Sequence, residues 1–542
     1  MSFSSRAVAA LLGLSPVRSR RVRSELDLPV PMPDGSVLFA DRWYPEDIES
    51  PPVVLVRSPY GRSGYMSMVG RIFAERGYQA VIQSCRGTAG SDGEFIPFRN
   101  EAVDGRATFA WLERQPWFSG KVATWGGSYL GLTQWASAAD APSYVKAMAT
   151  SITASAAGAA IVNPGGAFAL ESTLRWASEN SLPTVKGFRA TKRQRDEMDA
   201  RLKSAYSVLP LSAGDQSVVG RPVAFYQQWL EHDDPADPWW READFSESVP
   251  SVAVPVSMVA GWYDMFLPYQ LEDFAELQAA GRSPRITIGP WAHGDLGLFK
   301  PLFRDALEWF DARLLDKPAP PRKAVRLRLV GSGRWVEFDQ WPPDGKQRTW
   351  YLDAGRSLGQ DLPADSPPDA YRYDPADPTP GLGGPSLAPA NKGPKDNRDR
   401  EARPDVVLFT SRPSTGNTTF IGPLTAHLHF SSTSRHTDIH VTLCDVAPNG
   451  KSTNISSGIV RLRGVDTDPG TAVKVEMWPV GWTLRSGHRM RVQVSSGAHP
   501  TYARNPGTGE PLATAAVLHA SDQLVYHDPQ HPSRLEMREV AL

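Results

Sequence analysis

Residues 121–139, KVATWGGSYLGLTQWASAA, decide the fold prediction. The first part is an apolar run typical of a buried strand, and the second part has the composition of a helix. One serine, Ser128, stands at the junction, directly after Gly126 and Gly127. A sharp strand-to-helix turn lifts such a hydroxyl above the edge of a sheet, and the helix directs its first N–H groups toward the same point. We therefore predict that Ser128 is a nucleophile at the carboxyl end of a strand.

The spacing around this serine departs from the usual pattern. The common form is G-x-S-x-G, whereas here Leu130 stands two residues after Ser128 and the glycine, Gly131, comes third. A serine that merely caps a helix is the alternative interpretation of the local pattern. The rest of the chain must therefore decide between the two.

Two residues farther along the chain favour the nucleophile. Asp264 ends the apolar run VAGWYD, and His293 follows the next run, in IGPWAHG. Of the 11 histidines, only His232 and His293 precede the C-terminal region of short strands. A serine, an acid and a histidine, each after a sheet strand and in this order, are typical of an acyl-transfer triad. We predict that His293 is the general base and that Asp264 orients it.

Around these residues the chain alternates between strands and helices up to about residue 320. This rhythm predicts an α/β core with a mostly parallel sheet and helices on both faces. It is interrupted by a helical insertion, which we expect to cap the sheet. Beyond a proline-rich linker at 317–321, short strands bounded by turn residues begin with VRLRLVGS and WVEFDQWP and predict a β-sandwich or jelly roll. The expected divisions are core 1–152, cap 153–247, core 248–320 and β domain 321–542, with a surface loop over 361–404.

Composition narrows the function classes further. A net charge of -1 gives no electrostatic reason to expect nucleic acid or an anionic membrane as a partner. Seventeen Trp residues suggest aromatic-lined pockets. Cys85 and Cys444 are too few for a disulfide framework or a metal site, and we expect two free thiols and no metal. The N-terminal segment lacks a signal cleavage site, so we expect a frayed amphipathic lead-in and a cytoplasmic location rather than secretion.

Longer stretches of the chain resemble a known family. They are RSPYG, CRGTAGSDGEF, QPWFSGKVATWGGSYLG, AGWYDMF and IGPWAH, followed near the C-terminus by DIHVTLCDVAPNG and VYHDPQHPSRLEMREV. In this order they resemble the cocaine esterase and Xaa-Pro dipeptidyl-peptidase group of serine hydrolases (CocE/NonD type). The resemblance implies an α/β-hydrolase core, a helical cap and a C-terminal jelly roll of the galactose-binding-like kind. It also implies an oxyanion hole made by the Tyr60 hydroxyl and the backbone N–H of Tyr129.

The chemistry expected from these residues is covalent acyl transfer, which needs no cofactor. The expected substrate is a small ester, and the same triad would serve an Xaa-Pro dipeptidyl-peptidase or an amidase. A ligand-binding protein with a degenerate hydrolase domain is the alternative from another class, and a homodimer is left open. The related α-amino-acid ester hydrolases carry Glu at the position of Leu130, which argues against that activity here.

Several aromatic residues are candidates for the pocket wall: Trp262, Phe266 and Trp291 beside the triad, and Trp176 in the cap. For each, ordinary core packing is the alternative. A peptidase would need a carboxylate to bind the substrate ammonium, and only the cap offers one, through Glu171, Glu179 or the acidic run at 231–237.

Overall fold

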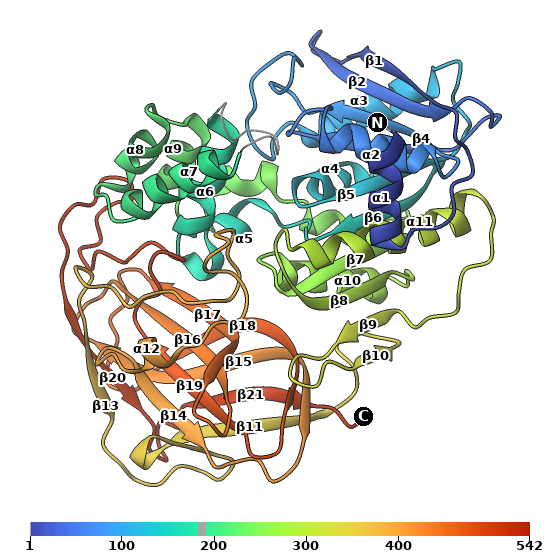
Figure 1. Ribbon diagram of the computed structural model, residues 1–542. Coiled ribbons are helices and arrows are strands. Elements are labelled where there is room, and N and C mark those ends of the chain that lie inside the picture. The colour runs from blue at the N-terminus through green and yellow to red at the C-terminus, as the bar shows by residue number, and fades with distance from the viewer. Residues whose placement is uncertain (1, 183–190) are drawn as a thin grey trace.

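A computed structural model describes residues 2–182 and 191–542. The first domain alternates strands and helices, as its sequence predicts (Figure 1). Its elements before the cap are α1 (Ser2–Leu12), β1 (Val22–Pro31), β2 (Val37–Pro45), β3 (Val53–Ser58), α2 (Tyr65–Ala74), β4 (Gln79–Ser84), α3 (Glu101–Glu113), β5 (Val122–Gly127), α4 (Tyr129–Ala138) and β6 (Val145–Ser151). Those after the cap are β7 (Val256–Tyr263), α10 (Leu267–Ala279), β8 (Arg285–Ala292), α11 (Leu296–Leu314), β9 (Val325–Arg328) and β10 (Trp335–Phe338).

These strands form one mixed sheet in the order β1-β2-β4-β3-β5-β6-β7-β8-β9-β10. The strands from β4 to β9 along this order run parallel, and antiparallel pairs close both ends. The central strands are buried along their whole length because each face is covered by helices. One apolar core joins α3, α4 and α10 to the sheet, and a second joins α2 and α11. The carboxyl ends of the parallel strands therefore share one edge.

The helical insertion lies between β6 and β7 and has its own apolar core. It contains α5 (Gly158–Val162), η1 (Pro164–Gly166), α6 (Leu170–Ser181), α7 (Lys192–Ala205), η3 (Leu211–Ala213), α8 (Gly214–Val219), α9 (Ala224–Glu231), η4 (Pro238–Ala243) and η5 (Ser246–Ser251). Within the predicted insertion, the stretch RATKRQRDEMDARLKSAY contains α7, and its first two residues lie outside the described part of the chain.

The first two strands predicted for the β domain join the first sheet instead. The strands VRLRLVGS and WVEFDQWP are β9 and β10, and β9 pairs in parallel with β8 of the first sheet. The proline-rich stretch at 317–321 lies in the connection from α11 to β9. The alternating pattern of these residues was misleading because edge strands with one solvated face have the same period as sandwich strands.

The C-terminal domain is all-β, as predicted, with strands that enclose a single apolar core. It contains β11 (Lys346–Asp353), η6 (Ala354–Arg356), β12 (Ser357–Gly359), β13 (Asp369–Tyr373), α12 (Arg398–Glu401), β14 (Val407–Ser411), β15 (Thr418–Ser432), β16 (Thr437–Val446), β17 (Ser452–Leu462), β18 (Thr471–Leu484), β19 (Arg489–Ser495), β20 (Ser521–Tyr526) and β21 (Arg534–Glu539). The long strand β15 pairs with β18 on one side and with β20 and β21 on the other, with a bulge between Gly422 and Leu424. Figure 1 shows this domain, in yellow, orange and red, against both the first domain and the cap.

Three smaller observations complete the fold. The N-terminal lead-in is the helix α1, which packs against α2 and α11 and buries Leu12. Cys85 and Cys444 are free and buried, and burial raises the pKa of both thiols. Among residues 2–182 and 191–542, no helix combines the length and the apolar composition needed to cross a membrane.

Candidate active site

Ser128 stands on the strained turn that its sequence predicts. It lies between the end of β5 and the start of α4 with φ 56° and ψ -129°, a conformation rare for a residue with a side chain. The glycine spacing around it has a packing explanation. A Cβ on Gly126 would lie 2.4 Å from the Leu130 Cβ, and a Cβ on Gly131 would lie 2.2 Å from Thr153. Both positions therefore need glycine. The second glycine stands three residues after Ser128 rather than two, at the point where α4 packs against Thr153.

Ser128, His293 and Asp264 come together at the shared edge of the sheet. His293 Nε2 lies 3.1 Å from Ser128 Oγ, and His293 Nδ1 lies 2.8 Å from Asp264 Oδ2. The Asp264 carboxylate is completely buried, and its second oxygen accepts a hydrogen bond of 2.9 Å from the Phe266 N–H. Such an arrangement can hold the imidazole with its free nitrogen toward the serine hydroxyl.

Tyr60 follows β3 at the same edge, and its hydroxyl accepts a hydrogen bond of 3.3 Å from the indole of Trp176. Burial raises the pKa of Tyr60 to about 12, so the phenol keeps its proton at neutral pH. Tyr129 begins α4, where an amide N–H has no acceptor within the helix. Both groups predicted to form the oxyanion hole are therefore close to Ser128. Tyr129 is the next residue in the chain, and Tyr60 lines the same cavity as Ser128.

The side chain of Tyr129 is anchored away from the cavity centre. Its hydroxyl donates a hydrogen bond of 2.9 Å to Glu101 Oε1 and accepts one of 2.9 Å from the Phe98 N–H. Glu101 in turn forms a buried ion pair of 2.8 Å with Arg57. This network fixes the first residue of α4 and hence the direction of its amide.

A cavity of about 550 Å³ opens above Ser128 and His293, roofed by the cap. Trp176 and Phe266 line it, as predicted. The Phe266 ring centroid lies 5.7 Å from that of His293, and Trp176 stacks on Tyr129 at 6.1 Å. The wall is mostly aromatic and aliphatic, with further lining residues Tyr65, Met66, Phe98, Trp125, Leu132, Trp229, Leu298 and Phe299. A cavity of this size and character suits a small, largely apolar substrate.

Comparison with known proteins places this geometry in a family. Residues 34–295 match the X-Pro dipeptidyl-peptidase (S15) family, and residues 319–536 match its C-terminal non-catalytic domain. The chain is 30% identical to the cocaine esterase of Rhodococcus sp. (strain MB1 Bresler) over 93% of its own length and 96% of that protein. The chain belongs to the cocaine esterase and X-Pro dipeptidyl-peptidase family. It is therefore a serine hydrolase that acts on esters or peptides.

Solved structures share the fold over the whole chain. An aminopeptidase from a marine sediment Thaumarchaeota archaeon superposes with a TM-score of 0.81 at 22% identity, covering 96% of each chain. An α-amino acid ester hydrolase superposes with a TM-score of 0.80 at 22% identity, covering 97% of this chain and 98% of that one. These similarities show that the chain shares its overall fold with both proteins.

Two of the predicted wall residues lie elsewhere. Trp262 is buried between the domains, where its indole donates a hydrogen bond of 2.7 Å to the Arg328 carbonyl and its ring packs on Gly481. Trp291 covers Gly289 and contacts Ile152, Val259 and Leu298. Neither is among the residues that line the cavity. Both precede the turn at the end of their strand and so pack on the flanks of the sheet, whereas the residues after the turn face the cavity.

Of the cap carboxylates considered as partners for a substrate ammonium, Glu179 lines the cavity. Its side chain is 42% exposed and forms an ion pair of 3.3 Å with Arg175. Desolvation raises the pKa of this carboxyl, against the opposing effect of Arg175. Glu171, by contrast, is buried against the β domain, where Ser386 and Asn391 donate hydrogen bonds to it.

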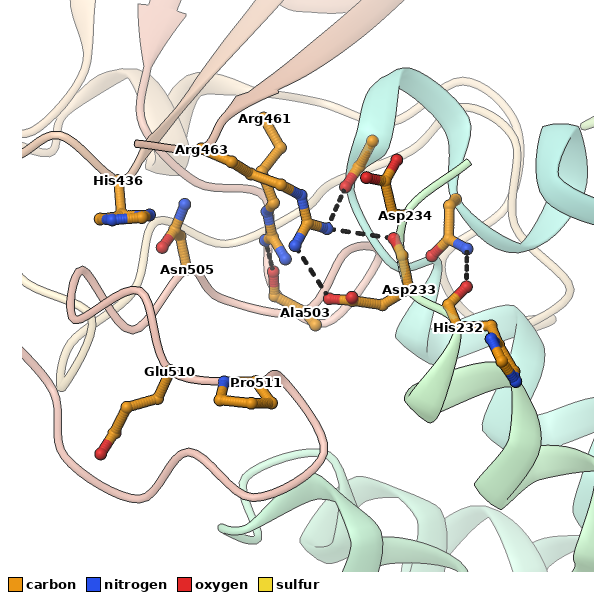
Figure 2. A network of polar contacts seen from close by, with 12 residues as sticks. His232, Asp233, Asp234, His436, Arg461, Arg463, Ala503, Asn505, Glu510 and Pro511 are labelled. Carbon is orange, nitrogen blue, oxygen red and sulfur yellow. Dashed lines mark hydrogen bonds and ion pairs between the residues drawn. The ribbon is translucent and has the colours of Figure 1, made fainter. Parts of the chain in front are cut away.

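The acidic run at 231–237 is also directed away from the cavity. Figure 2 shows it at the junction between the cap and the β domain, where Arg463 binds the Asp233 carboxylate at 3.1 Å and the Asp233 carbonyl at 3.0 Å. Asp237 pairs with His232 at 2.7 Å. Asp233 thus attaches the cap to the β domain, Asp237 pairs within the cap, and no residue of the run is among those that line the described cavity.

The C-terminal domain contributes to the cavity, which the sequence does not predict. Leu387, Pro389 and Lys392, from the stretch interpreted as a surface loop over 361–404, all line it. The ammonium of Lys392 donates a hydrogen bond of 2.9 Å to the carbonyl of His293. The loop has no hydrophobic period, and its contacts join residues about a hundred positions apart, so no local signal in the sequence reveals them.

Proposed function

We propose that the chain is a carboxylesterase that cleaves small acyl esters through an acyl-enzyme on Ser128. The hydrogen-bonded chain from Ser128 through His293 to Asp264, at the floor of an apolar cavity, carries this proposal. The 30% identity to a cocaine esterase supports an ester as the substrate. No cofactor takes part in the proposed chemistry.

In the proposed reaction, Ser128 Oγ attacks the acyl carbon while His293 Nε2 accepts its proton. Asp264 stabilises the resulting imidazolium, and the Tyr60 hydroxyl and Tyr129 N–H donate to the oxyanion. His293 then protonates the leaving alcohol, which departs and leaves the acyl group on Ser128. Water repeats the sequence on the acyl-enzyme and releases the acid.

The experiment that tests this proposal is labelling with a fluorophosphonate, which phosphonylates an activated serine. We expect one label per chain, competition by an ester substrate, and no label on Ser128→Ala. Labelling that persists in Ser128→Ala would place the nucleophile elsewhere and overturn the proposal.

A second candidate function is cleavage of an acyl group that carries an amine, as in an Xaa-Pro peptide. The carboxylate of Glu179 in the cavity wall favours it, because a buried ammonium needs an acidic partner. Against it, Arg175 already pairs with that carboxylate, and no other acidic side chain is among the residues lining the described cavity.

A further inference from the structure

The backbone carbonyls of Asp264 and His293 both bind side chains of the C-terminal domain. Trp478, on β18, donates its indole N–H to the Asp264 carbonyl at 2.9 Å. Lys392, in the loop between β13 and α12, donates to the His293 carbonyl at 2.9 Å. We propose that Lys392 and Trp478 are positioning residues, through which the C-terminal domain sets the distance between acid, base and nucleophile. This inference rests on the proposed triad.

Lys392 closes the short turn that carries His293. Within this turn the Asp295 N–H donates to the Ala292 carbonyl at 3.1 Å, and Asp295 Oδ2 accepts from the Ala292 N–H at 2.8 Å. The ammonium of Lys392 reaches the other carboxylate oxygen of Asp295 at 2.7 Å. The Lys392 ammonium thus bridges the His293 carbonyl and the Asp295 carboxylate, and two of the three N–H groups of the ammonium have fixed acceptors.

The loop that carries Lys392 is itself fixed on both sides. Gly384 and Gly393 exchange backbone hydrogen bonds of 2.8 and 2.9 Å. Asn391 donates a hydrogen bond of 3.0 Å to Glu171 of the cap helix α6. The Lys392 side chain is only 19% exposed, so its long stem is held rather than free in solvent. A rigid support of this kind is what a positioning contact requires.

Trp478 acts on the acid from the opposite direction. Although it belongs to β18, its ring is buried in the apolar core of the first domain. The Asp264 carbonyl that it binds also accepts a hydrogen bond of 3.3 Å from the Leu267 N–H, at the start of α10. The acid is therefore attached to its own helix and to the C-terminal domain at a single carbonyl oxygen.

Loss of these contacts should slow the chemistry more than it weakens binding. A displacement of about 1 Å in a reacting group can cost on the order of a hundred-fold in rate. Neither contact uses the atoms that exchange protons, so the expected effect is smaller than that of removing a triad member. Lys392 also lines the cavity, and a role in binding substrate would instead appear in KM.

The decisive variant is Lys392→Met, which keeps the length and the apolar stem but removes the donors. We expect kcat on p-nitrophenyl butyrate and the rate of fluorophosphonate labelling to fall together by about ten-fold or more. KM and the thermal midpoint should stay near the wild-type values. Lys392→Arg should restore most of both rates. The matched control is Lys395→Met, in the same loop, because no hydrogen bond or ion pair of that ammonium to either triad turn is found in the described residues.

Three outcomes would overturn the inference: a wild-type labelling rate in Lys392→Met, a loss confined to KM, or a loss that Lys392→Arg does not restore. Trp478→Phe is the independent second variant, since it removes only the indole donor from a packed ring. It should also lower kcat, and the double variant should lose less than the product of the two single losses, because both act on one Asp264–His293 pair. Labelling of Ser128→Ala distinguishes failure of the proposed triad from failure of the positioning role. If Ser128→Ala is still labelled, the triad is refuted. If Ser128→Ala is not labelled and Lys392→Met is labelled at the wild-type rate, only the positioning role is refuted.

Discussion

The indole N–H of Trp176 donates a hydrogen bond of 3.3 Å to the hydroxyl oxygen of Tyr60, across 116 positions in the sequence. A tyrosine hydroxyl has one proton to donate. The Tyr60 hydroxyl also interacts with the side chain of Ser128. The cap helix α6 thereby orients a donor that belongs to the core. This contact supports the proposed role of Tyr60 as an oxyanion donor.

Tyr60→Phe removes this donor with little change of shape. We expect kcat to fall by about a hundred-fold or more, because an oxyanion donor acts in the transition state. KM should change far less. Steady-state kinetics on p-nitrophenyl butyrate measure both values. A change confined to KM would mean that Tyr60 binds the substrate in its ground state.

The partner of Tyr60 predicts a smaller effect. Trp176→Phe keeps an aromatic ring in the cavity wall but removes the indole donor, so the Tyr60 hydroxyl loses its orientation. A neutral hydrogen bond contributes about 1 kcal/mol, which corresponds to a loss of roughly five-fold in kcat. If Trp176→Phe causes no further loss in the Tyr60→Phe background, the two residues act through one contact. Equal losses in the wild-type and Tyr60→Phe backgrounds would show that Trp176 and Tyr60 act independently.

The triad predicts graded losses. His293→Ala should cost nearly as much as Ser128→Ala, since the nucleophile and its base act as a unit. Asp264→Asn should lower kcat by roughly a thousand-fold or more, because the amide favours the wrong imidazole tautomer. Single-turnover kinetics with an activated ester measure the acylation step directly. Near wild-type acylation in Asp264→Asn would show that another carboxylate orients His293.

The positions of Ser128, Asp264 and His293 were predictable because short local segments of the sequence determine them. Ser128, Asp264 and His293 each follow an apolar run, and the carboxyl ends of parallel strands must share an edge. The fold class follows from the same alternation. What the local pattern could not explain was Gly131, whose position depends on Thr153 in the next strand connection.

The cavity wall was less predictable, for a physical reason. Trp262 and Trp291 are adjacent to the triad in sequence, yet the turn at each strand end separates their direction from that of Asp264 and His293. Lys392 and Glu179 reach the cavity from another domain and from the cap. Their placement depends on how the C-terminal domain and the cap pack against the core. The periodicity of a single sequence does not predict this packing.

Asp273 predicts a pH dependence of stability. It lies on α10 and accepts hydrogen bonds from the N–H and the hydroxyl of Ser155, at the start of the cap segment. Burial raises the pKa of its carboxyl to about 7, from an ordinary value of 3.8. The folded state binds this proton more tightly than the unfolded state. Protonation of Asp273 therefore contributes fully to the free energy of unfolding below about pH 4, and this contribution is lost as the pH rises toward 7.

The measurement is urea unfolding of wild type and Asp273→Asn at several values of pH. The difference in unfolding free energy between the two proteins should move against the wild type between pH 4 and 7, by up to a few kcal/mol. Comparing the two proteins at each pH cancels the titration of all other groups. A difference that stays constant over this range would show that Asp273 is ionised in the folded protein at low pH.

The substrate class depends on Glu179. The cavity is walled by aromatic rings, and the carboxylate of Glu179 is already paired with Arg175, so an uncharged acyl group should be preferred. We expect kcat/KM on p-nitrophenyl butyrate to exceed that on an Ala-Pro anilide by at least about a hundred-fold, which corresponds to nearly 3 kcal/mol of transition-state preference. Glu179→Gln should leave the ester rate close to wild type. The matched control is Glu197→Gln, because that carboxylate pairs with Arg193 on the exposed side of α7. Comparable rates on ester and anilide, with the anilide rate lost in Glu179→Gln and kept in Glu197→Gln, would assign the carboxylate to a substrate ammonium and replace the esterase proposal with a peptidase.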